Sequence, residues 1–61
     1  MDYVEGDVVV SLKRQSNAPI RKGQVLTVCY TYEKDTYVRV LDSKLGYGIH
    51  NVPTSTLRRT I

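Results

Sequence analysis

The 61-residue chain has few of the residues that usually reinforce a very small protein. Cys29 is the one cysteine, which excludes an intrachain disulfide. His50 is the one histidine, and one His with one Cys falls short of the four ligands of a structural zinc site. A domain of this size buries only about 60% of its unfolded surface. The chain, which we expect to be a single domain over residues 1–61, must therefore form a compact closed core or associate with other copies.

Long apolar segments are also missing. The valine run at 8–10 is far shorter than the roughly 20 residues of a membrane-spanning helix. Glu5 and Asp7 stand beside it, where a signal peptide would carry positive charge. We expect a cytoplasmic protein without membrane contact, present as a monomer or a small homo-oligomer. A short chain that begins at Met1 is typical of stand-alone phage and mobile-element genes, and we expect an accessory protein of that type.

Valine- and tyrosine-rich segments separated by turn residues predict an all-β chain. In residues 22–40, two β-branched and aromatic runs flank a polar hinge at 33–36, which is a hairpin pattern. Five short strands must curl and close to hide their edges, so we expect a small five-stranded barrel. The predicted strands are 8–12, 24–32, 37–41, 47–52 and 57–61, with a short 3₁₀ turn at 54–56 before the last strand.

Side chains alternate between the two faces of a strand, and this alternation predicts the core. In the first strand we expect Val8, Val10 and Leu12 to face inward and Val9 and Ser11 to face outward. Tyr30 would extend the core beyond the mouth of the barrel, and Ile20 would anchor the loop after the first strand. The predicted central core is Val10, Leu26, Val28, Val38, Val40, Val52 and Leu57.

Three short motifs resemble Src-homology-3 domains. The stretch KGQVLTV at 22–28 is similar to the KGDxLxV that opens the second strand of those domains. Lys34 and Asp35 before an aromatic residue resemble the segment after their second hairpin loop, and Val52-Pro53 followed by Leu57 resembles their closing VPxxYV. The resemblance covers residues 22–57 and implies a Src-homology-3-like barrel. Such barrels serve many unrelated tasks, so the resemblance implies the fold more directly than the function.

The peptide groove of those domains has counterparts here, residue by residue. Its tryptophan corresponds to Tyr37, or to Thr36 if the hinge is one residue shorter. Its proline corresponds to Pro53, and its closing-turn tyrosine to Thr56, where the ring is lost. The acidic residues of the neighbouring loop are replaced by cations, which would repel a proline-rich ligand that carries arginine. These cations are Lys13, Arg14, Arg21 and Lys22.

Tyrosine and arginine on one outer face form the predicted binding surface. The third and fourth strands should project Tyr37, Arg39 and Tyr47 on this face, near Asn51. Tyrosine combines an apolar ring with a hydrogen-bonding tip, and Tyr and Arg are enriched among interface hot spots. We therefore predict a small non-catalytic module, without a cofactor, that recognises a protein partner. The predicted contact residues are Tyr37, Arg39, Tyr47, Asn51 and Pro53.

Nucleic acid is the alternative ligand. Small barrels bind nucleic-acid strands by stacking bases on aromatic rings while cations follow the phosphates. Nine Lys and Arg against six Asp and Glu leave a net charge of +3, which permits such binding without demanding it. The loop cations could equally serve only to keep the loop in water. The candidate phosphate contacts are Lys13, Arg14, Arg21, Lys22, Arg58 and Arg59.

A second resemblance points to an enzyme. Residues 23–25, 37–38, 57–58 and 61 are similar to the plasmid-borne type II dihydrofolate reductases, which are tetramers of such barrels. The pore chemistry of those enzymes depends on a Val-Gln-Ile-Tyr run. The matching stretch at 47–50 retains only the isoleucine, and Gly48 offers no side-chain amide for pterin or nicotinamide. A Cys–His nucleophile pair would also lack an orienting carboxylate nearby in the sequence. We therefore expect a protein that is not an enzyme.

Overall fold

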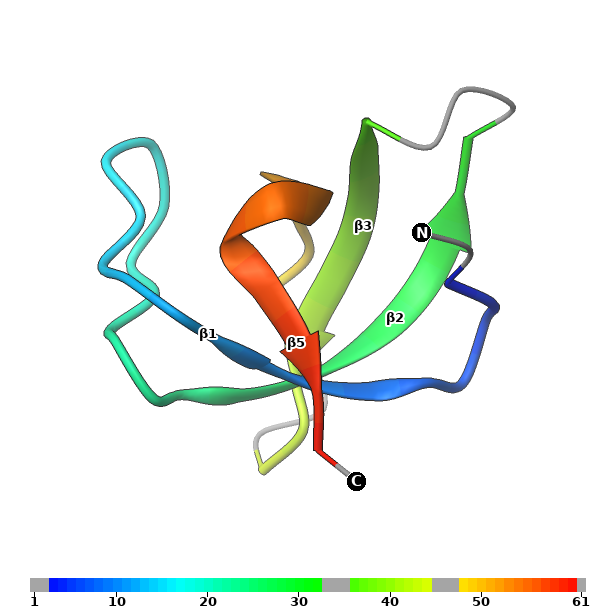
Figure 1. Cartoon of the computed structure of the whole chain (residues 1–61), viewed down its shortest axis with the longest axis horizontal. Helices are drawn as coiled ribbons and strands as arrows, with labels where there is room; N and C mark the ends of the chain where they lie inside the picture. The colour runs from blue at the N-terminus through cyan, green and yellow to red at the C-terminus, as the bar shows by residue number, and fades with distance from the viewer. Residues whose placement is uncertain (1–2, 33–35, 45–47, 61) are drawn as a thin grey trace.

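The structure is a computed structural model that describes residues 3–32, 36–44 and 48–60. Five antiparallel strands form one sheet in the order β4-β3-β2-β1-β5 (Figure 1). No pairing of β4 with β5 occurs among the described residues, so the predicted closed barrel stays a prediction, whereas the all-β class is confirmed. The strands are β1 (Val8–Ser11), β2 (Val25–Thr31), β3 (Tyr37–Asp42), β4 (His50–Pro53) and β5 (Leu57–Arg59), and the 3₁₀ turn η1 (Thr54–Thr56) precedes β5.

The predicted element order is confirmed, with shifts at the ends of strands. The fourth strand begins at His50 rather than at position 47. Residues 33–35 of the predicted hinge, and residues 45–47 with the predicted start of the fourth strand, lie outside the described residues. Gly48, just before β4, has a φ of +83°, which glycine adopts without the strain other residues would meet. In the part of the chain that the structure describes, no helix is long and apolar enough to cross a membrane.

The core lies on one face of the sheet. Cross-strand pairing places Val28 opposite Val40 and Val38 opposite Val52, so these four side chains meet in its centre. The predicted anchor Ile20 and six of the seven predicted core residues are buried, which confirms the faces of β3, β4 and β5 and of the first half of β2. The buried hydrophobic residues are Tyr3, Val9, Ile20, Leu26, Val28, Val38, Val40, Val52 and Leu57.

The face assignment of β1 is wrong. Val9 and Ser11 are buried, whereas Val8 is 43% and Leu12 44% exposed, and Val10 is half-buried. Three consecutive valines put an apolar residue on both faces, so alternation carries no signal here. Ser11 is buried but keeps its hydrogen bonds. Its hydroxyl donates to the Lys13 carbonyl at 2.6 Å and accepts from the Gln15 side-chain amide at 3.1 Å.

A β-bulge divides β2 into two halves with opposite facing. The pairing runs Val28 with Val40 and then Tyr30 with Arg39, so Cys29 is an extra residue in β2. After this insertion, the odd-even pattern reverses and Tyr30 turns outward, where it is 50% exposed. The prediction that Tyr30 extends the core is therefore wrong. The bulge instead turns the second half of β2 into part of the outer face.

The loop between β1 and β2 (residues 12–24) is fastened to the domain by Gln15 and Ile20, both buried. The Gln15 backbone N–H donates to the Ile20 carbonyl at 3.0 Å, which closes the loop on itself. The Gln15 side-chain amide donates to the Thr56 hydroxyl at 2.8 Å, which ties the loop to η1. The loop therefore has a defined position beside η1 (Figure 1).

Candidate functional site

The outer face of β2, β3 and β4 carries a cluster that we name the Tyr/Arg face. Tyr37 lies opposite Pro53, and Arg39 lies opposite Asn51 on one side and Tyr30 on the other. Cross-strand pairing thus brings together four of the five predicted partner contacts, while Tyr47 lies outside the described residues. The Tyr/Arg face consists of Tyr30, Tyr32, Tyr37, Arg39, Asn51 and Pro53.

Tyr32 is the centre of a hydrogen-bond network on this face. Its hydroxyl donates to Asn51 Oδ1 at 2.8 Å and accepts from Arg39 Nε at 3.1 Å. Its ring meets the Tyr30 ring edge to face, with centroids 5.0 Å apart and an interplanar angle of 79°. The Arg39 guanidinium lies over the Tyr30 ring at 5.8 Å from its centroid. Contacts of these kinds between β2, β3 and β4 hold the polar groups of the face in defined positions.

Tyr37 projects from the start of β3 and is 48% exposed, so its predicted outward orientation is confirmed. Tyr32, Thr36, Tyr37 and Asn51 line an open hollow of ≈ 300 Å³. The backbone at its rim is held by Thr54, whose N–H and hydroxyl both donate to the Thr36 carbonyl, at 2.9 and 3.2 Å. The aromatic side chain is therefore exposed on a backbone that η1 holds in place.

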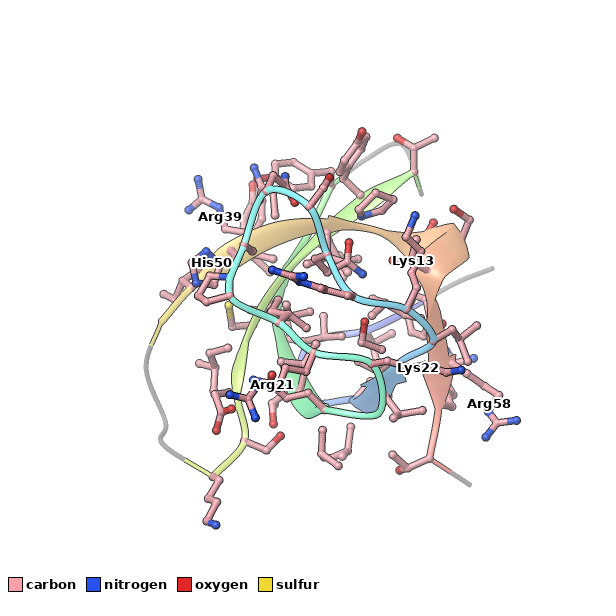
Figure 2. All side chains as sticks on the ribbon, turned by 90° about the vertical axis from the view of Figure 1, so that its left-hand side faces the viewer. Lys13, Arg21, Lys22, Arg39, His50 and Arg58 are labelled. Atoms are coloured by element: carbon pink, nitrogen blue, oxygen red, sulfur yellow. The ribbon has the colours of Figure 1, made fainter. Side chains whose placement is uncertain are left out.

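The loop cations are exposed and stand apart from acidic side chains in the sequence. No acidic residue occurs between positions 8 and 32. Figure 2 looks onto this loop, and the labelled side chains of Lys13, Arg21 and Lys22 spread around it instead of converging on one point. Arg14 and Arg21 both line an open hollow with Ala18 and Pro19. The loop therefore carries positive charge spread over its surface, with two arginines at one hollow.

The two predicted cations of β5 have different surroundings. Arg58 is exposed. Arg59 forms a salt bridge with Asp7 at 3.2 Å, and its guanidinium lies 4.9 Å from the centroid of the Tyr3 ring. These contacts fasten the segment before β1 to β5, so Arg59 has a structural role in addition to any contact with a ligand.

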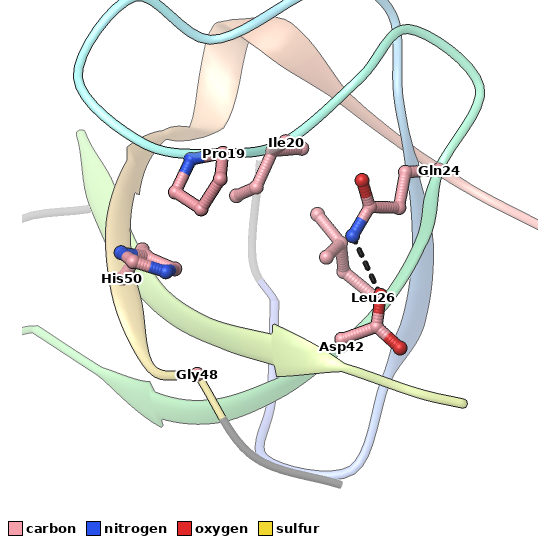
Figure 3. A pocket seen from close by; sticks show the side chains of 7 residues that line it. All are labelled: Pro19, Ile20, Gln24, Leu26, Asp42, Gly48 and His50. Carbon is pink, nitrogen blue, oxygen red and sulfur yellow. Dashed lines mark hydrogen bonds between the residues drawn. The ribbon is translucent and has the colours of Figure 1, made fainter. Parts of the chain in front are cut away.

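A small cavity of ≈ 160 Å³ opens between the loop and the β3–β4 side of the sheet (Figure 3). At one wall, Gln24 Nε2 donates to Asp42 Oδ2 at 2.6 Å, and His50 lies across the cavity from this pair. Cys29 has other neighbours, since its thiol donates to the Arg39 carbonyl at 3.5 Å. The cavity is further lined by Pro19, Ile20, Leu26 and Gly48.

Within the described ranges, no three His, Cys, Asp or Glu side chains lie close enough together to hold a metal ion. The site residues that sequence reasoning missed are Tyr30 and Tyr32. Their spacing of two predicts that they share a face, but only the bulge at Cys29 decides which face it is. Comparisons of the chain with protein-family models, with curated proteins and with solved structures find no match.

Proposed function

We propose that the protein is a small non-catalytic binding module that recognises a protein partner through the Tyr/Arg face. The observation that carries this proposal is the position of Tyr37, which is half exposed opposite Pro53 and next to the hollow at the start of β3. A tyrosine that merely completed a core would be covered. Exposed tyrosines around an arginine have the composition of interface hot spots, in which a few aromatic and Arg residues carry most of the binding energy.

We further propose that the sheet belongs to a Src-homology-3-like barrel. Three features support this: the strand order β4-β3-β2-β1-β5, the long loop between β1 and β2, and the 3₁₀ turn between β4 and β5. Tyr37 and Pro53 are the residues that the resemblance equates with the groove aromatic and the groove proline. Their direct pairing across β3 and β4 is compatible with a shared contact surface of that kind.

Nucleic acid is a second candidate partner. Four exposed cations in a chain stretch without acidic residues, 8–32, favour it, because affinity for nucleic acid comes largely from Lys and Arg at phosphates. The spread of Lys13, Arg21 and Lys22 around the loop favours it less, since a phosphate backbone follows a continuous positive track. We therefore rank a protein partner first.

Tyr37→Ala tests the proposed surface. A display library of random linear peptides is selected on the wild-type protein, and the recovered peptides are measured on both proteins by fluorescence polarisation. An outward tyrosine contributes little to the core, so the variant should melt close to wild type. Loss of a hot-spot side chain should weaken peptide binding by about 2 kcal/mol, which is roughly 30-fold. Val4→Ala, at an exposed apolar residue outside the Tyr/Arg face, is the control and should bind like wild type.

Salt dependence separates the two candidate partners. Each phosphate contact with single-stranded nucleic acid lowers affinity by about 0.7 log units per log unit of salt. Single- and double-stranded oligonucleotides are therefore titrated at two salt concentrations alongside the peptides. Micromolar or tighter oligonucleotide binding with a slope of about three or more would replace the protein partner by nucleic acid. A Tyr37→Ala variant that binds the selected peptides as well as wild type would remove the Tyr/Arg face from the proposal.

A further inference from the structure

Arg39 is the cation of the Tyr/Arg face, and its side chain is held by residues of the neighbouring strand. Its Nε donates to the Tyr32 hydroxyl at 3.1 Å, and its guanidinium lies over the Tyr30 ring. Tyr32 is itself oriented by its hydrogen bond to Asn51 on β4. The direction of the guanidinium is therefore set by contacts from the strands on both sides of β3.

These contacts leave most of the guanidinium available. Arginine has five N–H donors, and the Tyr32 contact uses the one on Nε. Among the described residues, no carboxylate lies within ion-pair distance of Arg39, and its side chain is exposed. Two of the described acidic groups are bound elsewhere: Asp7 pairs with Arg59, and Asp42 accepts from Gln24. The terminal nitrogens of Arg39 thus form an oriented fork of donors at the surface.

We propose that this fork is a carboxylate receptor, so that the protein partner presents an Asp or Glu side chain to Arg39. This inference rests on the proposed function and specifies the chemistry of its partner. A planar guanidinium donates two parallel hydrogen bonds to a carboxylate, a geometry that lysine does not reproduce. Because Arg39 is already oriented, it loses little side-chain freedom when a partner binds.

The charge around the site agrees with an acidic partner. The cations of the loop, in a stretch without acidic residues from 8 to 32, raise the local concentration of negatively charged chains. A phosphate would also accept from the fork. However, the Arg39 guanidinium lies over the Tyr30 ring and the Tyr32 ring meets Tyr30 edge to face, so the two rings beside the fork already contact protein groups, and Tyr37 is the exposed ring without such a contact among those described. A base needs a free ring face for stacking, and the carboxylate of a peptide has no such need.

The test compares peptide selections on the wild type and on two variants, Arg39→Gln and Arg58→Gln. Arg58 is a matched control because it is also an exposed arginine, but on β5. We expect peptides selected on the wild type and on Arg58→Gln to be enriched in Asp and Glu, and peptides selected on Arg39→Gln to lose this enrichment. Thermal melts of all three proteins, with Arg39→Lys as a further variant that keeps the charge, verify that each is folded.

A double-mutant cycle then locates the carboxylate. One selected peptide is synthesised in two forms. The first keeps its Asp or Glu, and the second carries Asn or Gln at that position. On the wild type, this replacement should weaken binding by roughly 10-fold or more, the range for a hydrogen bond to a charged group. On Arg39→Gln the same peptide replacement should change binding less than about 2-fold, because the guanidinium that binds the carboxylate is already absent. Arg39→Lys should fall between the two, since it keeps the charge without the fork.

Several outcomes overturn the inference. Selected peptides without acidic enrichment would show that the Tyr/Arg face binds peptides by another chemistry, in which case the proposed function stands and the receptor role of Arg39 fails. An acidic preference that persists in Arg39→Gln would place the carboxylate on other cations. Failure to select any peptide, together with oligonucleotide binding that Arg39→Gln abolishes, would overturn both the inference and the protein-binding function.

Discussion

Truncation of Leu26 to alanine should remove most of the stability of this domain. Leu26 is almost completely buried in β2, between Val9 of β1 and Asp42 of β3. Replacing a buried leucine by alanine costs about 2–5 kcal/mol, since the lost contacts leave a cavity. A core in a chain this small supplies about 3–5 kcal/mol in total. The variant should therefore be largely unfolded at room temperature or retain only a small margin.

Leu12→Ala is the matched comparison, because it removes the same atoms from a side chain that is nearly half exposed directly after β1. We expect it to cost less than about 1 kcal/mol. Urea unfolding followed by far-ultraviolet circular dichroism measures both variants, and thermal melts extend the comparison. One kcal/mol corresponds to about 4–8 °C for a domain of this size. The two costs differ by at least about 1 kcal/mol, so Leu26→Ala should melt at least about 4–8 °C below Leu12→Ala.

Two results would refute this reasoning. If Leu26→Ala melted like wild type, the inward face of β2 would be assigned incorrectly. If Leu12→Ala cost as much as Leu26→Ala, the face of β1 that carries positions 8, 10 and 12 would belong to the core. The second result would restore the predicted inward face of β1, which the structure contradicts.

Two further predictions concern the loop between β1 and β2. Gly23 has a φ of +84° and no heavy atom within 4 Å of an added Cβ, so Gly23→Ala should cost about 1–2 kcal/mol through backbone strain alone. Gly23→Asn should cost less in urea unfolding, because asparagine tolerates this conformation better, and equal stability of all three proteins would contradict the assigned φ. Gln15→Ala should lower stability by about 1–3 kcal/mol, because the hydroxyls of Ser11 and Thr56 lose their shared donor. An unchanged melting temperature would show that this amide does not hold the loop.

The order of the strands and most of the core were predictable because local signals agreed with one another. In β3, Val38 and Val40 alternate with Tyr37 and Arg39, so one period-two pattern specifies both the buried and the exposed face. Pro53 and the residues at 54–56 likewise predict the end of β4 and the following 3₁₀ turn, which the structure confirms.

The errors arise where a choice depends on neighbours that are distant in the sequence. The valines of β1 fit either face, and pairing with β2 and β5 decides that Val9 is buried. The direction of Tyr30 depends on the bulge at Cys29, which is defined by the register with β3. The salt bridge of Arg59 with Asp7, near the other end of the chain, could not be predicted for the same reason, and the candidate phosphate contact of Arg59 stays a prediction. Local sequence patterns contain no information about such partners.

The outer face of β3 and β4 was predictable because it depends on patterns that are local in the sequence. Tyr37, Arg39, Asn51 and Pro53 follow from alternation within two strands that are consecutive in the sequence and pair with each other. The hydrogen bonds through Tyr32 could not be predicted, because they require the reversed facing after the bulge. Sequence reasoning therefore placed these four residues on one face and missed Tyr32, the residue that connects their polar groups.

The pairing of β1 with β5 determines when this domain can fold during synthesis. Val9 pairs with Arg59 and Ser11 with Leu57, so β1 has to wait for the strand that leaves the ribosome last. Until then, a valine-rich strand has an open hydrogen-bonding edge, which is a known hazard for association with other chains. A premature stop before Leu57 would make this exposure permanent. We therefore expect such truncated chains to aggregate or be degraded, even though most of the sheet has already been translated.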